Sequence, residues 1–433
     1  MVVSTFLSRV LSWQRKGEMG ELQEQLSILR QRIARIDEKY AGFTAPSRLL
    51  NAAPTRPLVE DLELVLTGGE VETKFGKHFE TEKLYEHHRH HGSADIGALA
   101  DLPHDLLETI SDGSVLNVPP EEWAFLDTET TGLAGGSGTY AFLTGVGRIT
   151  REGFRVRQFF MRDYGEEASA LDAVSRHLEP FRVLITYNGR AFDQPLLEKR
   201  YRMNRARPPF ARMQHLDLLF GARRLWKLRF ESCRLVDLEN QVLGVERQGD
   251  LPGALIPYVY FEYLRTQLAA RLLPVFHHNA TDILTLACLT GIVPFAFKDP
   301  NSMPVRHAAE MVGLARWLRQ AGDGERALQL FRRAVDAGLR DDLLFRTLWD
   351  IALSERKSGR PDAALAVWTD LAAARNPYQV RAFEELAKHH EHRAKDPARA
   401  LEFTREALQH EESSALRKRE ERLLRRTAGR AAR

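Results

Sequence analysis

Two carboxylates at the end of an apolar segment are the residues of this sequence best suited to chemistry. Asp127 and Glu129 follow the apolar run 123–126, which predicts a buried strand. In a strand, residues two apart point to the same face, so these carboxylates project side by side. They repel each other unless a positive charge lies between them. Hard oxygen ligands favour Mg²⁺ or Mn²⁺ over zinc, so the pair predicts a divalent-metal site.

Two further motifs each place an aspartate near the start of a helix. Tyr187-Asn188-Gly189-Arg190-Ala191-Phe192-Asp193 follows another apolar strand, and His277-His278-Asn279-Ala280-Thr281-Asp282 runs into the apolar helix 283–292. Taken alone, Asp193 is explained by the first turn of a helix, where negative charge suits the helix dipole. Taken alone, Asn279 and Asp282 are explained as an N-cap and its capping-box partner.

Taken together, the three motifs resemble, in order and residue type, those of the DEDD exonuclease superfamily. The resemblance implies a ribonuclease-H-like fold in which four carboxylates hold two divalent cations, Mg²⁺ or Mn²⁺. It also implies that metals ~3.5–4 Å apart stabilise the attacking and leaving oxygens of an in-line phosphodiester displacement. A histidine or tyrosine near the last aspartate would orient or deprotonate the attacking water.

A narrower resemblance covers about residues 68–297. The segments that carry it are 127–133, Gly135-Gly136-Ser137-Gly138, Asp250-Leu251-Pro252-Gly253 and His278-Asn279-x-x-Asp282. They are similar to those of the YprB-type ribonuclease-H-like family. Members of that family are regarded as candidate exonucleases, some with tetratricopeptide repeats, and the resemblance does not bring a substrate with it.

Carried over position by position, the resemblance makes Asp127, Glu129, Asp193 and Asp282 the proposed metal ligands. The superfamily places its catalytic residue four or five positions before the last aspartate, and both His278 and His277 meet this spacing. On a helix, four residues differ by about 40° and five by about 140°, which favours His278 if the helix begins before Asn279. The family's His-Asn-x-x-Asp pattern also favours His278.

The candidate substrate-binding residues stand within the first two motifs. They are Thr128, Thr130, Asn188 and Phe192. Asn188 is expected to support its motif by hydrogen bonding and Phe192 by packing. Asp217 is a spare carboxylate that could stand behind the metal ligands, although a surface or capping role explains it better.

The elements that must position these residues alternate between strands and helices. Segments 123–126, 140–149, 154–161 and 183–186 are predicted as strands, and helices are predicted over 168–178 and through Leu196 and Leu197. The predicted fold class is therefore α/β, a ribonuclease-H-like mixed sheet flanked by helices. We assign it to residues 121–297.

Residues 305–425 are predicted to form all-α repeats. Ala327-x3-Phe331-x2-Ala334, Ala364-x3-Trp368-x2-Leu371 and Ala400-x3-Thr404-x2-Ala407 repeat one helix face at spacings of 37 and 36 residues. This resembles tetratricopeptide repeats, whose usual period is ~34, although Thr404 stands where an aromatic residue is expected. A protein partner would bind there; the alternative is an irregular helical bundle.

The remaining segments are less informative. In residues 1–45, an apolar stripe from Leu22 to Tyr40 predicts a helix that either forms a homodimer or docks on the main body. Residues 46–120 are predicted as a linker followed by a β-hairpin around Gly76. The run His87 to His91 fits a metal site or, better, a solvated face. The last stretch, 413–433, has eight basic and two acidic residues, and is either solvated or lies along nucleic acid.

Composition narrows the setting. A formal charge of +3 is close to balance, so any nucleic-acid contact must come from local patches. Two cysteines, Cys233 and Cys288, indicate neither a disulfide framework nor a zinc site, and a reducing cytosol fits best. No stretch approaches the ~20 apolar residues of a membrane helix, so we expect a soluble cytoplasmic protein without membrane contact.

Three functions remain compatible with the sequence. The first is a 3′–5′ exonuclease acting on DNA or RNA by a two-metal mechanism. The second is a structure-specific endonuclease of the same fold. The third is a scaffold that binds nucleic acid or protein without cutting, which the presence of all four acidic residues disfavours.

Overall fold

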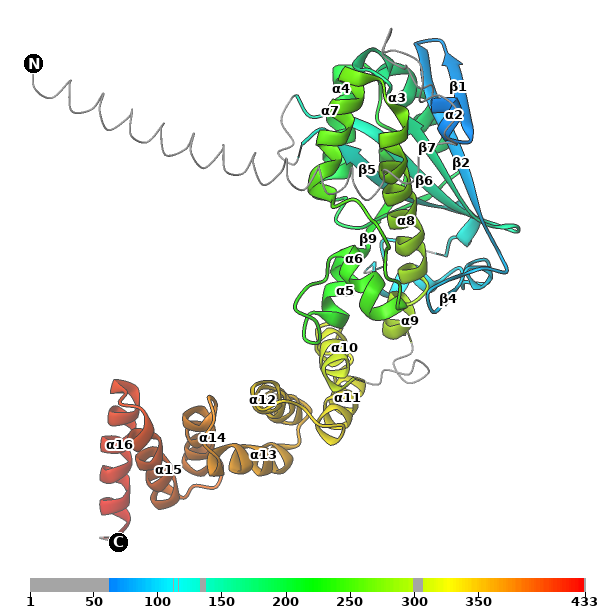
Figure 1. The fold of residues 1–433 in the computed structure, drawn as a ribbon. Helices are drawn as coiled ribbons and strands as arrows, with labels where there is room; N and C mark the ends of the chain where they lie inside the picture. The colour runs from blue at the N-terminus through cyan, green and yellow to red at the C-terminus, as the bar shows by residue number, and fades with distance from the viewer. Residues whose placement is uncertain (1–61, 112, 116, 133–137, 299–306, 432–433) are drawn as a thin grey trace, which may run out of the picture. The chain divides into compact units, whose positions relative to one another are not determined.

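The structure is a computed structural model that describes residues 62–111, 113–115, 117–132, 138–298 and 307–431 (Figure 1). The predicted N-terminal helix, the proline-rich linker and the glycine-rich residues 135–137 lie outside the described residues. The chain divides into two units, one of residues 1–59 with 247–250 and one of residues 60–246 with 251–433. The second unit carries all the candidate site residues and is described below.

The core of this unit is a mixed sheet of seven strands in the order β1-β2-β7-β6-β5-β8-β9. The pairs β5–β8 and β8–β9 are parallel, and the other neighbours are antiparallel. The strands are β1 (Gly68–Thr73), β2 (Gly76–Glu86), β5 (Trp123–Thr130), β6 (Ala141–Thr150), β7 (Gly153–Phe160), β8 (Val183–Thr186) and β9 (Gln214–Asp217). Strands β3 (His90–His91) and β4 (Ala94–Asp95) form a separate pair.

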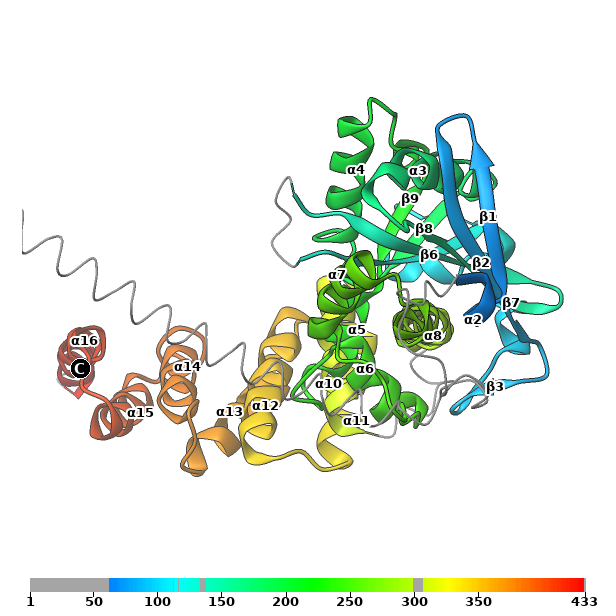
Figure 2. The ribbon, with the colours of Figure 1, turned by 45° about the horizontal axis from the view of Figure 1, so that its top comes forward.

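Helices cover both faces of the sheet, as Figure 2 shows for α3 and α4 on one face and α8 on the other. The α-helices of this part are α2 (Leu62–Val65), α3 (Glu167–His177), α4 (Asp193–Met203), α5 (Leu218–Trp226), α6 (Leu235–Leu238), α7 (Ile256–Thr266), α8 (Leu273–Thr290) and α9 (Val293–Lys298). Short helical turns connect them: η2 (Gly97–Leu99), η3 (Leu106–Thr109), η4 (Pro120–Glu122), η5 (Tyr164–Glu166), η6 (Pro209–Arg212), η7 (Glu239–Leu243), η8 (Gly253–Leu255) and η9 (Ala269–Leu272). The predicted α/β fold class is confirmed.

Strand β5 supplies both hydrophobic cores, because its side chains alternate between the faces. Trp123 and Phe125 belong to the cluster on the α8 side. Ala124 and Leu126 belong to the cluster on the α3 and α4 side. The alternation continues beyond the apolar run, so the side chains of Asp127 and Glu129 lie on the face of the sheet that α8 covers.

Helix α8 packs closely on strand β6 at two positions where the strand has glycine. A Cβ atom on Gly145 would come within 2.2 Å of Asn279 Oδ1 and 2.3 Å of Ile283 Cδ1. A Cβ atom on Gly147 would come within 2.5 Å of Ile283 Cγ2. Real Cβ atoms do not tolerate such distances, so glycine at these two positions sets how closely α8 can approach.

The structure corrects two features of the predicted organisation. The hairpin β1–β2 turns between Thr73 and Gly76 as predicted, but β2 pairs with β7, so the hairpin is part of the main sheet. Strand β9 and helix α5, which the sequence patterns did not reveal, add an edge to the same sheet.

Two of the histidines near the hairpin, His78 and His91, serve the fold. The buried His78 contacts Ser169 Oγ and Glu80 Oε1 at 2.9 and 2.8 Å. His91 contacts Thr285 Oγ1 at 2.9 Å and the buried Glu239 carboxylate at 3.0 Å. The prediction of a wholly solvated face is therefore wrong for His91, while His88 is exposed.

The C-terminal region is all helical, as predicted. Its helices are α10 (Ala308–Gln320), α11 (Gly324–Asp336), α12 (Asp341–Lys357), α13 (Pro361–Ala373), α14 (Gln379–His392), α15 (Pro397–His410) and α16 (Ser414–Ala431). The nine repeated positions of the predicted pattern lie on α11, α13 and α15, and all are buried. The tetratricopeptide class stays a prediction.

Two buried glutamates near the C-terminal ends of α12 and α14 add to this regularity. Glu355 on α12 pairs with Arg360, and Glu391 on α14 pairs with Arg422 and Arg426 of α16. Glu355 and Glu391 are 36 residues apart, which is the spacing of the last two repeats. Part of the basic charge of the C-terminal stretch is therefore used to hold α16 on α14.

Among the described residues, one helical stretch is long and apolar enough to cross a membrane by length and composition only. It is Ala269–Lys298, which contains an 18-residue window with a mean hydropathy of 1.7. The expectation that no stretch would qualify is wrong in this respect. Because 78% of its apolar window is buried inside the protein, as in an ordinary core helix, it is weak evidence for a membrane span.

We predict that Gly145→Ala destabilises the fold. The added methyl group would press on Asn279 and Ile283 of α8, and overpacking of this kind costs about 1–3 kcal/mol. Urea denaturation would measure the free energy of unfolding. Gly69→Ala in β1 is the matched control, because nothing lies within 4 Å of its added Cβ; equal stabilities of the two variants would contradict the prediction.

Candidate active site

The site starts at the polar end of β5, where Asp127 is held from above by helix α8. The side-chain amide of Asn279 donates to Asp127 Oδ2 at 2.8 Å and to the Asp127 carbonyl at 3.3 Å. A neutral donor steadies the carboxylate without supplying the positive charge that a metal would supply. Asp127 therefore has a fixed orientation on the α8 side of the sheet.

Asn279 itself is oriented by a buried glutamine. Gln158 on β7 donates to Asn279 Oδ1 at 2.9 Å and to the Phe276 carbonyl at 2.9 Å. Because Asn279 Oδ1 accepts from Gln158, its amide nitrogen must point to Asp127. The interpretation of Asn279 as an N-cap is wrong, since α8 begins at Leu273 and Asn279 lies fully buried within it.

The last carboxylate and its histidine lie on the same helix. His278 Nε2 is 3.6 Å from Asp282 Oδ2, four residues further on. Both side chains are partly buried, whereas His277 is exposed. Because α8 begins before His277, the condition that favoured His278 on helix geometry is met.

Asp193 approaches β5 from the other face. The Thr128 hydroxyl donates to Asp193 Oδ1 at 2.5 Å, as expected from strand alternation, which turns Thr128 away from Asp127. Burial raises the pKa of the Asp193 carboxyl to about 6, although hydrogen bonds from Thr128 and the backbone oppose the rise. The nearby Asp217 carboxylate raises it further.

Asp217 is buried and organises the second motif. Its carboxylate accepts hydrogen bonds from the Asn188 and Arg190 backbone amides at 2.8 and 3.1 Å. It also caps α5 by accepting from Leu219 N at 3.1 Å. Asn188 has φ 69°, a left-handed conformation that asparagine tolerates. Asp217 is thus a capping residue but not a surface residue, and it ties the Asn188 turn to α5.

The remaining candidate substrate-binding residues differ in what they contact. Thr130 donates to the Gly132 carbonyl at 3.1 Å, within the turn that follows β5. Phe192 is 57% exposed, so the predicted packing role is wrong, and its ring is open to solvent beside Asp193. Sequence reasoning missed Gln158, since a glutamine within an apolar strand carries no motif.

The donor chemistry fits a hard divalent cation, but the carboxylates do not form a ready-made cage. Among the described residues, no group of three or more histidine, cysteine or acidic side chains is arranged to hold a metal ion. Mg²⁺ is commonly held by one or two carboxylates, with water and substrate phosphates completing the shell. Asp127 is already oriented for that kind of ligation, and a cation would offset the unfavourable ionisation of the half-buried Asp193.

Comparison with known proteins agrees with this fold. A model of the ribonuclease H superfamily matches residues 124–293, which include all four carboxylates. YprB of Bacillus subtilis (strain 168), described as an uncharacterized protein, is 32% identical over 286 residues, covering 66% of this chain and 68% of the relative. The fold is thus that of the ribonuclease H superfamily, which is typical of nucleases. Within it, the chain belongs to the YprB family.

The hydrogen bonds through Asn279 can be tested by a double-mutant cycle. We expect Asn279→Leu to lower the free energy of unfolding by about 1–3 kcal/mol, because it leaves a Gln158 amide hydrogen buried without its acceptor. Gln158→Met should also destabilise. The double variant should lose less than the sum, since both polar partners are then absent. Strictly additive losses in urea denaturation would contradict the pairing.

The raised pKa of Asp193 predicts a pH-dependent effect of Asp193→Asn. The folded chain keeps the proton up to about pH 6, whereas the ordinary pKa is 3.8, so stability falls as the pH rises between these values. Without divalent metal, the variant should gain about 1–3 kcal/mol at pH 8 and little at pH 4. Urea denaturation in EDTA would measure both. The exposed Asp370→Asn is the control, and an equal gain at both pH values would contradict the prediction.

Proposed function

We propose that this chain is a metal-dependent nuclease that removes nucleotides from the 3′ end of DNA or RNA. The observation that carries the proposal is the Asp127 carboxylate oriented by Asn279 on the face of β5 where α8 also carries His278 and Asp282. A structural role alone gives no reason to orient the Asp127 carboxylate on the strand face that Glu129 shares. The membership in the ribonuclease H superfamily supports nuclease chemistry.

Each residue of the site has a proposed task. Asp127, Glu129, Asp193 and Asp282 would hold Mg²⁺ or Mn²⁺, which when bound supplies charge to the attacking and leaving oxygens. Asn279 keeps Asp127 in its rotamer, and Thr128 does the same for Asp193. His278 would accept a proton from the attacking water, with Asp282 beside it to favour the charged ring.

Substrate contacts fall to the residues near the second motif. The exposed ring of Phe192 would stack on a terminal base, which does not require a particular sequence. Arg190, on the same turn, is exposed and offers a cation for a phosphate. Thr130 and Asn188 would shape the turns on either side of that base.

The other parts of the chain are assigned by their architecture. We assign to α10–α16 the recruitment of a protein partner, since stacked helix pairs present extended binding surfaces. Both cysteines are free thiols in the structure, which supports a reducing, cytoplasmic setting. Self-association through residues 1–45 remains part of the proposal.

The proposal predicts end-directed, metal-dependent cleavage. Single-stranded and duplex DNA and RNA, labelled at either end, would be incubated with Mg²⁺, Mn²⁺ or EDTA. We expect progressive shortening from the 3′ end with metal only. The variant Asp127→Asn/Glu129→Gln should lose at least about 10²–10³-fold in rate, because preorganised charge at the reacting phosphate is removed.

The matched control is Glu402→Gln/Glu406→Gln on α15, which removes two exposed carboxylates from the helical region. It should cleave like the wild type. Internal cuts with metal would replace the exonuclease by an endonuclease of the same fold. Absence of cleavage on every substrate, with nucleic-acid binding that ignores metal, would overturn the enzyme proposal in favour of a scaffold.

A further inference from the structure

The outer face of helix α5 carries an unusual set of side chains. Its exposed positions, together with the residue that follows the helix, are Phe220, Arg223, Arg224 and Lys227. These positions are three, four and seven residues apart, so they form one stripe on the helix. Phe220 is 52% exposed, and every side chain of the stripe is aromatic or cationic. We call this stripe the α5 face.

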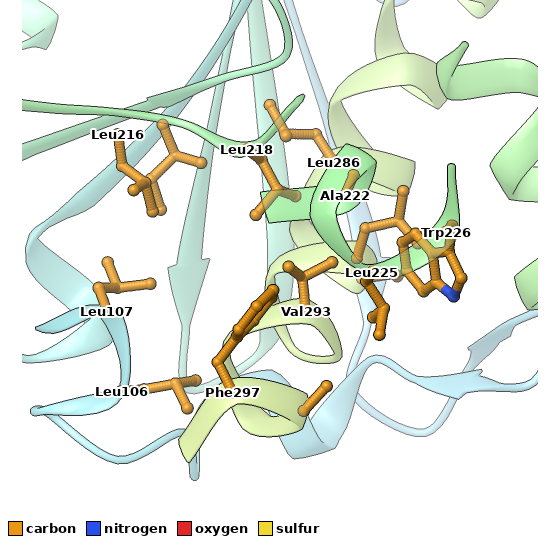
Figure 3. Close-up of a cluster of buried hydrophobic side chains, with 14 of the residues drawn as sticks. Leu106, Leu107, Leu216, Leu218, Ala222, Leu225, Trp226, Leu286, Val293 and Phe297 are labelled. Carbon is orange, nitrogen blue, oxygen red and sulfur yellow. The ribbon is translucent and has the colours of Figure 1, made fainter. Parts of the chain in front are cut away.

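The opposite side of α5 fixes the direction of that face. Leu218, Ala222, Leu225 and Trp226 are buried in the same cluster as Val293 and Phe297 of α9 (Figure 3). Rotating the helix to hide Phe220 would expose these core residues. Burial of each large apolar side chain among them stabilises the fold by about 1.5–3 kcal/mol, which the rotation would forfeit. Packing therefore holds the aromatic ring and the cations toward solvent.

The cations of the α5 face differ from the arginines that follow them. Arg229 pairs with Glu310 at 2.6 Å, and Arg234 pairs with Asp237 at 2.8 Å. In the part of the chain that the structure describes, no ion pair involves Arg223, Arg224 or Lys227. As far as the described residues go, their charge is therefore available to a ligand.

The α5 face is joined to the candidate active site by hydrogen bonds. Asp217 caps α5 through Leu219 N and also holds the backbone amides of Asn188 and Arg190. The same turn leads to Asp193 within a few residues. A ligand lying along α5 from its N-terminal end thus reaches the loop that carries one of the proposed catalytic carboxylates.

The local charge favours a polyanion as the ligand. Residues 187–234 contain twelve basic and four acidic residues, although the whole chain has a formal charge of only +3. Arginine and lysine bind backbone phosphates, and an exposed aromatic ring stacks on a base. Since the bases of a duplex are already stacked and paired, the ring selects an unpaired strand.

We propose that the α5 face binds single-stranded nucleic acid and leads it to the Asn188–Asp193 turn. The cations contact successive phosphates, and Phe220 stacks on one base. The role of this binding, which is to deliver a strand for cleavage, rests on the proposed nuclease function. The binding itself can be measured without cleavage.

The test uses the full chain in EDTA, with fluorescein-labelled oligothymidylate as the probe and anisotropy as the readout over a range of salt concentrations. In Arg223→Gln/Arg224→Gln/Lys227→Gln, we expect the affinity to fall at least about 10-fold and the salt slope to fall by about 2, as for three lost contacts to a single strand. Phe220→Ala should weaken binding about 10-fold and leave the slope unchanged, and Phe220→Trp should bind like the wild type.

The matched control is Lys357→Gln/Arg375→Gln/Arg381→Gln, which removes three exposed cations from the helical region. It should keep the wild-type slope. Equal losses in both triple variants would overturn the proposal, because general charge would then explain binding. Wild-type affinity in the α5 variants, or tighter binding to a duplex than to the single strand, would also overturn it.

The outcome is separable from that of the nuclease proposal. If the α5 variants bind normally while the wild type cleaves with metal, the α5 face is not the path and the nuclease function stands. If the wild type does not cleave but the α5 triple variant alone loses binding, the binding face stands and the nuclease function fails.

Discussion

The amide of Asn279 ties the candidate active site to the core of the fold. It accepts from Gln158 on β7, donates to Asp127 on β5, and belongs to α8, so three elements meet at a single buried side chain. A buried amide group without a hydrogen-bond partner would be costly. The hydrogen bonds of Asn279 to Gln158 and to Asp127 are therefore expected to form or break together. It also requires glycine at position 145, because any Cβ there would displace Asn279. The position of α8 and the orientation of the first carboxylate are thus set by the same contacts.

Asp217 has a similar part at the other side of the site. It is buried, and its two oxygens are shared between the Asn188 turn and the first turn of α5. One carboxylate therefore positions both the loop that leads to Asp193 and the helix that carries the α5 face. Neither Asn279 nor Asp217 needs to touch a substrate to matter, since each acts by fixing the groups that would. Sites of this kind depend on such supporting residues as much as on the catalytic ones.

The sequence predicted the parts of this arrangement that have a local signature. The runs before Asp127 and within 183–186 are apolar because they are buried on both faces, and they became β5 and β8. What it could not predict depends on contacts between distant segments. Strand β9 has four residues, three of them polar, and is too short for a period to show. The position of Asn279 before an apolar helix is equally compatible with an N-cap. The exposure of Phe192 likewise follows from the turn around Asn188, not from its own hydrophobicity.

The Asp193 carboxylate weakens the metal-free fold while it serves the proposed chemistry. Burial opposes the ionisation of Asp193, and Asp217 adds a like charge. Near neutral pH, which lies above the pKa of about 6, Asp193 of the metal-free chain is ionised, and its raised pKa then lowers the free energy of unfolding. Thr128 and the backbone amides offset only part of this cost, and a divalent cation would offset much more. The fold can carry the unfavourable ionisation of Asp193 only if other contacts stabilise it. The close packing of α8 on β6 and the buried Gln158–Asn279 hydrogen bond are such contacts.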